Sequence, residues 1–96
     1  MSRPSALTLI GKALSLHQRE RMLRMLRDGE LCGCQFVPQL GLDPSVVSRH
    51  LAVLERAGLV TSRRDGARLL WSLTDPDILR VLDELTELVR EREVVG

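Results

Sequence analysis

One segment constrains the fold most strongly, because it predicts a helix that is followed at once by a tight β-hairpin. Asp43 is a favourable N-cap residue, and Pro44 suits the first position of a helix. The helix predicted over residues 44–57 ends at Gly58, since glycine adopts the left-handed conformation of a helix C-terminus at little steric cost. Both ends of this helix are therefore marked by the local sequence.

The hairpin signal follows shortly after this helix. Asp65 and Gly66 form an Asp-Gly pair, which favours a two-residue hairpin turn because both residues accept a positive φ. The two predicted strands cover residues 59–64 and 68–73 on either side of the turn. Their tip carries three arginines, Arg63, Arg64 and Arg68.

Helical spacing of apolar residues, together with start and stop signals, predicts four further helices. Their predicted ranges are 5–14, 17–27, 34–40 and 75–93. We expect Pro38 near the first turn of the third helix, where a missing N–H is tolerated, and Gly41 at its end. The order helix, helix, helix, helix, hairpin, helix predicts a mainly α fold with a small β-hairpin. This is the order of a winged helix-turn-helix, here as one domain over residues 1–96.

The composition indicates a small folded protein. The 96 residues are 44% hydrophobic and 28% charged, which is ordinary for a globular domain. Phe36 and Trp71 are the only aromatic residues, which argues against a single-strand binder that stacks bases on aromatic side chains. No apolar run has the length of a membrane span and no secretory signal opens the chain, so we predict the cytoplasm and no membrane partner. We also predict no enzyme, since we find no nucleophile–base pair or phosphate loop.

The net charge of +1 is unevenly distributed along the chain. Residues 44–73 hold five basic and two acidic side chains, whereas residues 74–96 hold three basic and seven acidic ones. The basic surplus therefore coincides with the helix and hairpin described above, and the acidic segment should point away from phosphate. Lys12 is the only lysine, and arginine suits two-point contacts to phosphate and guanine better than lysine does.

The helix predicted over residues 44–57 has one apolar and one polar face. At about 100° per residue, Val47, Leu51 and Leu54 face the core. Small polar residues near the helix start permit close approach to base edges in a DNA groove. An ordinary solvated face has the same pattern, but the basic hairpin favours DNA. The predicted DNA contacts are Ser45, Val46, Ser48, Arg49, His50, Arg56, Arg63, Arg64 and Arg68.

The two cysteines, Cys32 and Cys34, lie one residue apart just before the third helix. Two thiolates this close are suited to a soft metal or metalloid, and a closed zinc site would need more ligands. His17 and His50 are the only histidines, and we assign neither a metal-binding role. The cysteine pair is therefore the candidate ligand site; a redox pair and inert packing are the alternatives.

The helix-to-hairpin segment resembles the ArsR/SmtB family of metal-responsive repressors. The resemblance rests on Val47-Ser-Arg-His-Leu51, Ala57-Gly-Leu-Val60 and Arg63-Arg-Asp-Gly66. Glu30-Leu-Cys-Gly-Cys34 is similar to that family's arsenic-sensing box, Glu-Leu-Cys-Val-Cys-Asp-Leu-Cys. The resemblance implies a homodimer joined by the helices 5–14 and 75–93, bound to a palindromic DNA operator. It also implies release of DNA when As(III), Sb(III) or a related thiophile binds Cys32 and Cys34.

The chain departs from the arsenic-sensing box at its third cysteine, where Val37 stands. Inorganic As(III) prefers three sulfur ligands, so a third donor must come from a small thiol, from water or hydroxide, or from a partner's cysteine. Alternatively, the arsenic already carries a carbon substituent, as in methylated or aryl arsenicals. DNA binding itself needs no cofactor in this interpretation.

The expected mechanism is distortion of the first turn of the third helix. A metalloid bonded to both thiols would pull the segment around Gly33 together, and glycine permits that change in the backbone. The third helix is expected to pack on the fourth, so the distortion would reach the DNA-reading helix. A thiol redox sensor with the same fold, and a winged-helix protein-interaction module with no DNA target, remain as alternatives.

Overall fold

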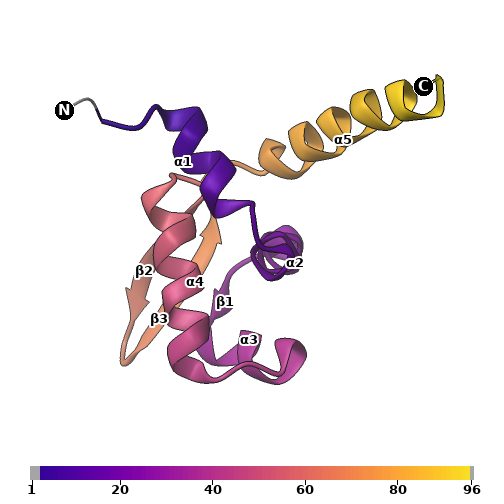
Figure 1. The fold of residues 1–96 in the computed structure, drawn as a ribbon. Coiled ribbons are helices and arrows are strands. Elements are labelled where there is room, and N and C mark those ends of the chain that lie inside the picture. The colour runs from indigo at the N-terminus through magenta and orange to yellow at the C-terminus, as the bar shows by residue number, and fades with distance from the viewer. Residues whose placement is uncertain (1–2, 96) are drawn as a thin grey trace.

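The computed structural model describes residues 3–95 of the chain, and the side chains of residues 3–92, as helices packed around a small antiparallel sheet (Figure 1). The winged helix-turn-helix predicted from the sequence is confirmed. The elements in chain order are α1 (Ala6–Ala13), α2 (His17–Met25), the 3-10 turn η1 (Leu26–Asp28), β1 (Leu31–Cys32), α3 (Gly33–Leu40), α4 (Pro44–Arg56), β2 (Val60–Asp65), β3 (Arg68–Leu73) and α5 (Asp77–Val95).

The turn between α3 and α4 forms as the local sequence requires. Gly41 ends α3 in the left-handed conformation, with φ 65°. Asp43 caps α4, and its Oδ1 accepts a hydrogen bond from the backbone N–H of Ser45 at 2.9 Å. Across the hairpin, Asp65 pairs with Arg68, so β2 and β3 form the two-stranded wing.

The sheet contains a strand that the sequence analysis missed. β1 pairs antiparallel with β3, with Leu31 opposite Trp71 and Cys32 opposite Leu70, and the strand order is β1-β3-β2. A strand of two residues shows no alternation of apolar and polar positions, which explains why the pattern did not reveal it. The segment that carries the cysteines is therefore hydrogen-bonded directly to the wing.

The start of α3 also differs from the prediction. The helix begins at Gly33, one residue earlier than expected, so Pro38 lies in its second turn and not near its first. Proline has no backbone N–H, and the carbonyl of Cys34 therefore lacks the helical hydrogen bond that residue 38 would otherwise donate. The first turn of α3 is held by fewer backbone bonds than an ordinary helix of this length.

One core joins α3, α4 and the wing. Phe36 of α3 and Leu54 of α4 are completely inaccessible to solvent, and Trp71 of β3 is buried in the same cluster. Because α3 contributes its largest apolar side chain to this core, a change in the backbone of α3 must alter its packing on α4.

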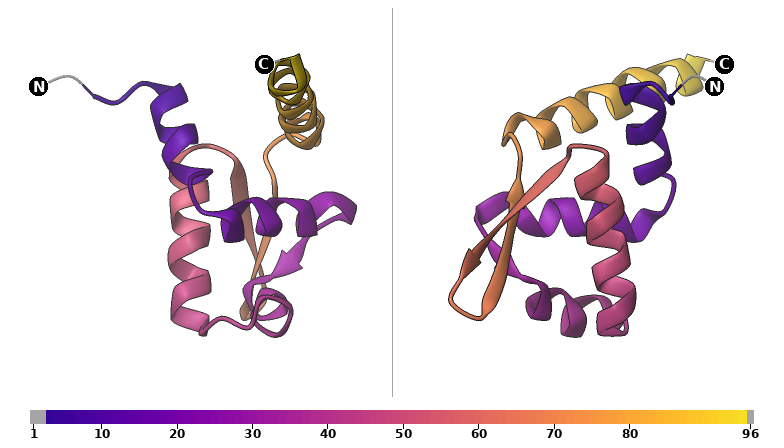
Figure 2. Two further views of the ribbon diagram at one scale, coloured as in Figure 1. Left: turned by 45° about the vertical axis from the view of Figure 1, so that its right-hand side comes forward. Right: turned by 90° about the vertical axis from the view of Figure 1, so that its left-hand side faces the viewer.

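Helices α1 and α5 lie at the other end of the molecule. Figure 2 shows α1 and α5 on the side opposite α3 and the tip of the wing. Both helices leave large apolar side chains in solvent: Leu7 of α1, and Val81, Leu85, Leu88 and Val89 of α5. No helix within residues 3–95 is both long and apolar enough to cross a membrane.

Candidate functional site

The two cysteine sulfurs converge at the junction of β1 and α3. The Sγ atoms lie 2.7 Å apart, and the thiol of Cys34 donates a hydrogen bond to the sulfur of Cys32. The backbone N–H of Cys34 approaches the same sulfur at 3.4 Å. Cys32 is buried and Cys34 is exposed. A thiophile from solvent can therefore reach Cys34 first, with the sulfur of Cys32 directly beside it. The predicted pair is thus arranged so that one atom can bond to both sulfurs.

Cys32 is also the N-cap of α3. Its sulfur accepts from the backbone at the start of the helix, and its own N–H donates to Oε1 of Gln35 at 2.7 Å. This is a capping box in which a cysteine takes the place of the usual serine or threonine. The spacing of Cys32 and Gln35 is that of a capping box, but the sequence alone does not indicate one because cysteine is not a typical capping residue. A ligand that takes the Cys32 sulfur competes with the cap.

The surroundings of the pair favour the ionised form of one thiol. The hydrogen bond from the Cys34 side chain lowers the pKa of Cys32, and the N–H of Cys34 and the positive charge of Arg68 lower it further. The same side-chain bond raises the pKa of Cys34, since Cys34 must keep its proton to donate it. Cys32 therefore ionises first, and its thiolate is the stronger metal ligand and nucleophile.

We expect Cys32 to react with iodoacetamide with a pH midpoint below that of an ordinary cysteine thiol. Replacing Cys34 with alanine removes the largest stabilising contact to the thiolate, so the midpoint should move upward. The measurement is the alkylation rate against pH, followed by mass spectrometry, with Cys32→Ala as the matched control. In that control the midpoint of Cys34 should move downward. A Cys34→Ala midpoint equal to or below that of the wild type contradicts the assignment.

A pocket of about 630 Å³ lies beside the sulfurs, between α3, α4 and the wing. Both cysteines line it together with Val37 of α3. The indole of Trp71 forms another wall, and a Cβ built on Gly33 would lie 3.9 Å from its Nε1 atom. Leu51 is one of several α4 residues on the opposite side. Local sequence patterns do not predict this pocket, because its walls come from segments that are distant in the chain.

Within the described residues, no third metal-binding side chain joins the pair. Among the side chains that the structure describes, no three His, Cys, Asp or Glu residues gather into a group that could hold a metal ion. Val37, which replaces the third cysteine of the resembled box, lines the same pocket as the pair. The donor set fits an atom that takes two bonds from the protein, and it does not supply the three sulfurs that inorganic As(III) prefers.

Most of the predicted DNA contacts on α4 are accessible. Ser45, Ser48, Arg49 and Arg56 are exposed, whereas Val46 and His50 are half-buried. His50 accepts a hydrogen bond at Nδ1 from Nε of Arg19 at 3.1 Å, which ties α4 to α2. Burial lowers the pKa of His50, and the charges of Arg19 and Arg49 lower it further, so the imidazole is neutral at pH 7.

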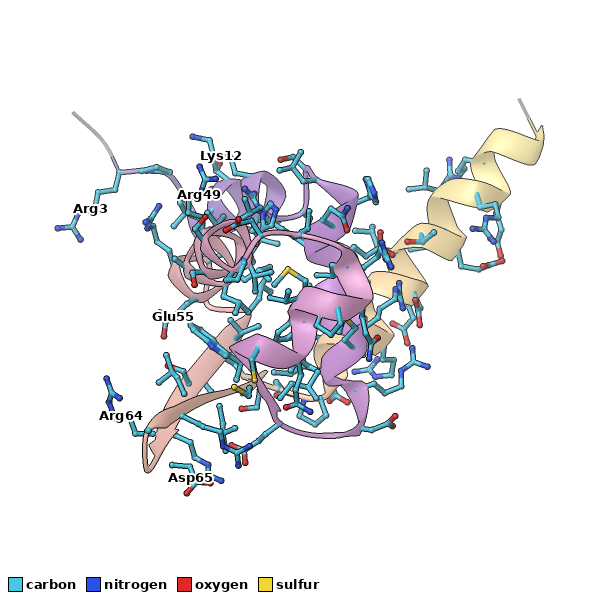
Figure 3. All side chains as sticks on the ribbon, turned by 90° about the horizontal axis from the view of Figure 1, so that it is seen from below. Arg3, Lys12, Arg49, Glu55, Arg64 and Asp65 are labelled. Carbon is cyan, nitrogen blue, oxygen red and sulfur yellow. The ribbon has the colours of Figure 1, made fainter. Side chains whose placement is uncertain are left out.

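The three wing arginines have different surroundings. Arg63 makes a two-point ion pair with Glu30, with Nε and Nη2 at 2.6 and 2.7 Å from the carboxylate oxygens. Arg68 lies 3.8 Å from Asp65 and lines the pocket beside the cysteines. Arg64 has no ion pair within the described part of the chain, and Figure 3 shows it extending away from the wing. Among these arginines, Arg64 is the one best placed to meet a phosphate.

Comparison with known proteins supports the same fold and class. Residues 17–62 match the family described as "Bacterial regulatory protein, arsR family". The regulator CmtR of Mycobacterium tuberculosis is 39% identical over 87 residues, covering 91% of this chain and 74% of that protein. The arsenic resistance regulator ArsR1 of Pseudomonas putida is 36% identical over 78 residues, covering 80% of this chain and 60% of that protein. The structure of HlyU from Vibrio cholerae has a TM-score of 0.73 at 30% identity, and the likeness covers 86% of this chain and 90% of HlyU.

The family match covers the helix-turn-helix and reaches the first residues of the wing, and the likeness to HlyU covers 86% of the chain. The relatives are transcriptional regulators, and this agrees with the prediction from the sequence that the protein is not an enzyme. The chain belongs to the arsR family of bacterial regulatory proteins and is a winged-helix DNA-binding transcriptional regulator.

Proposed function

We propose that this regulator is an operator-bound repressor that releases DNA when a thiophilic As(III) or Sb(III) compound binds Cys32 and Cys34. The observation that carries the proposal is the convergence of the two sulfurs, 2.7 Å apart, at the N-cap of a helix that packs on the DNA-reading helix. The similarity to ArsR1, which is named for arsenic resistance, supports the choice of inducer. A bacterial regulator that binds DNA acts in the cytoplasm, where the chromosome lies.

The coupling between thiols and DNA follows from the way α3 is held. Bonding of the Cys32 sulfur to an inducer removes the cap of α3, and loss of an N-cap costs about 1 kcal/mol. Pro38 has already removed one backbone bond from the first turn, so the cap is a larger share of what holds this turn. A coupling free energy of about 1–3 kcal/mol is enough to weaken DNA binding roughly 5–150-fold.

The structure offers a second route from the thiols to DNA. Cys32 is paired with Leu70 of β3, so the inducer site is also part of the wing sheet. Glu30, just before β1, holds Arg63 of the wing in the ion pair described above. A shift of β1 would therefore move the wing and the DNA-reading helix together, which makes release of both contacts a single event.

The exposed apolar residues of α1 and α5 support a homodimer. Leu7 is 76% exposed, and Leu85 and Leu88 are 58% and 62% exposed, which is unusual for leucines on the helices of a monomer. A two-fold pairing through these helices would set two α4 helices toward a palindromic operator, with half-sites about 34–36 Å apart. In this arrangement Ser45, Ser48 and Arg49 face base edges and Arg64 contacts the phosphate backbone.

A gel-shift titration on the promoter of the protein's own gene tests the proposal. Cys32→Ser and Cys34→Ser should keep the operator affinity of the wild type and lose release by methylarsonous acid. Arg49→Ala should show the reverse, with weaker operator binding and unchanged thiol reactivity, because it loses a base contact worth about 1–3 kcal/mol. The proposal is wrong if the serine variants still release DNA when the arsenical is added.

A redox sensor is the second candidate, and the closeness of the sulfurs favours it too. Two thiols at this separation could be oxidised to a disulfide by peroxide, and the bond would also remove the cap of α3. The same gel shift separates the two candidates. Release by peroxide, with none on addition of the arsenical, would assign the thiols to redox sensing.

A further inference from the structure

We infer that the pocket beside the thiols holds the organic group of a monosubstituted As(III) compound, and that an apolar group of about the size of a phenyl ring fits it best. This inference rests on the proposed function, because it names the class of inducer that the cysteine pair takes. The organic group would lie between α4 and the wing, against the indole of Trp71.

The first argument is the missing third ligand. Trivalent arsenic forms three bonds, and the site supplies two sulfurs, Cys32 and Cys34. Val37 lines the pocket at the position where the resembled box has its third cysteine, and its side chain has no donor atom. No group of three metal-binding side chains exists among those described. The described residues of the chain therefore supply no third bond to the arsenic, and a carbon substituent already present in the inducer is a bond that survives exchange with thiols.

The second argument is the chemistry of the pocket. Val37, Val47, Leu51 and Trp71 supply apolar walls, and the volume of about 630 Å³ leaves ample space for a ring. The polar side chains that reach it, Ser48 and Arg68, are both exposed, so they stand at its mouth. An apolar group gains by leaving water for such a space, whereas the hydroxyl groups of inorganic arsenite would lose hydrogen bonds to water there.

The third argument is the location of the pocket. Its walls belong to the thiol segment, to α4 and to the tip of the wing, which includes Ala67. A group held there touches the two elements that contact DNA, as well as the two sulfurs. The size of the organic group therefore affects both the affinity for the inducer and the relative position of α4 and the wing.

The bonding step balances without a further reactant. A compound R–As(OH)2 reacts with the two thiols, two As–S bonds form, and two As–O bonds break. Each thiol proton leaves with one hydroxide as water, and the As–C bond stays intact. Arsenic remains trivalent throughout, so the step needs no oxidant or reductant.

Direct binding to the DNA-free protein tests this inference. Trp71 is the only tryptophan in the chain and it lines the pocket, so its fluorescence reports occupation. Phenylarsonous acid, methylarsonous acid and inorganic arsenite are titrated in turn, and mass spectrometry checks that one arsenic is bound by two thiols. We expect the phenyl compound to bind at least about tenfold more tightly than the methyl compound, and arsenite to bind most weakly.

Filling the pocket should remove this preference. Ala52 lines the pocket from α4, and Ala52→Phe should abolish the advantage of the phenyl compound over the methyl compound. Ala67→Phe fills the pocket from the wing and is the second variant if the first does not fold. Gln39→Phe is the matched control, because Gln39 is exposed on α3 and does not line the pocket. It should keep the phenyl preference.

The outcomes separate this inference from the proposed function. Equal affinity for the three compounds, or a phenyl preference that persists in both filled variants, overturns the inference. If arsenite then still releases DNA in a cysteine-dependent manner, the proposed function stands. Binding that survives Cys32→Ser, or no binding of any arsenical to the wild type, overturns both.

Discussion

Replacing Val37 with cysteine is expected to raise the affinity for inorganic arsenite at least about tenfold, which corresponds to about 1.4 kcal/mol. Val37 lies one helical turn after Cys34 on α3 and lines the same pocket as the pair. A thiol there would supply the third sulfur that arsenite lacks in the wild-type protein. The measurement is the same Trp71 fluorescence titration, with release of operator DNA by arsenite as the second readout.

The matched control for this change is Val37→Ala, which shortens the side chain without adding a donor. It should leave the weak binding of arsenite as it is in the wild type. The phenyl compound gains nothing from a third thiol, since its arsenic already holds a carbon and two sulfurs, so its advantage over arsenite should shrink. Arsenite affinity that is equal in the cysteine and alanine variants would show that position 37 cannot reach the bound arsenic.

Replacing Phe36 with alanine is expected to lower the free energy of unfolding by about 3–5 kcal/mol. The Phe36 side chain is completely buried in the core that joins α3 to α4, and its removal leaves a cavity that this tightly packed region cannot close. A domain of this size is stable by only about 5–15 kcal/mol. The melting temperature should fall by more than about 10 °C, measured by circular dichroism at a fixed protein concentration.

Gln39→Ala is the control for the core prediction, because Gln39 is exposed on the same helix. A surface change of this kind usually shifts stability by no more than about 0.5 kcal/mol. If Phe36→Ala had the same melting temperature as the wild-type protein, the observed core would not be what holds α3 on α4. The proposed coupling between the thiols and the DNA-reading helix would then lose its physical basis.

The local signals in the sequence predicted much of the fold because each depends on a few neighbouring residues. Asp43 and Pro44 start α4 as expected. The hairpin forms where it was predicted, but its two-residue loop is Gly66-Ala67, one position later than Asp65-Gly66, and only Gly66 has a positive φ. The prediction for α2 ran slightly too far, since its last turn is the 3-10 turn Leu26–Asp28. Helix ends of this kind depend on the packing of the following turn, which the local sequence does not describe.

The features that the sequence analysis missed all depend on distant contacts. β1 is a strand only because Trp71 and Leu70 lie beside it. Arg63 was predicted as a DNA contact, and that role stays a prediction, but the structure adds its ion pair with Glu30, which is far away in the sequence. Arg68 was assigned to the wing alone, whereas in the folded chain it also lies near the cysteines.

The sequence by itself determined the order of the helices and the hairpin, the basic face of α4 and the presence of two neighbouring thiols, because caps, turns and helical periodicity are local properties. Only the tertiary structure decided that Cys32 caps α3, that Cys32 also pairs with the wing sheet and that an apolar pocket opens beside both thiols. A pocket is the space left between packed elements. Its shape therefore follows from how Val37, Leu51 and Trp71 are brought together, and no single segment contains that information.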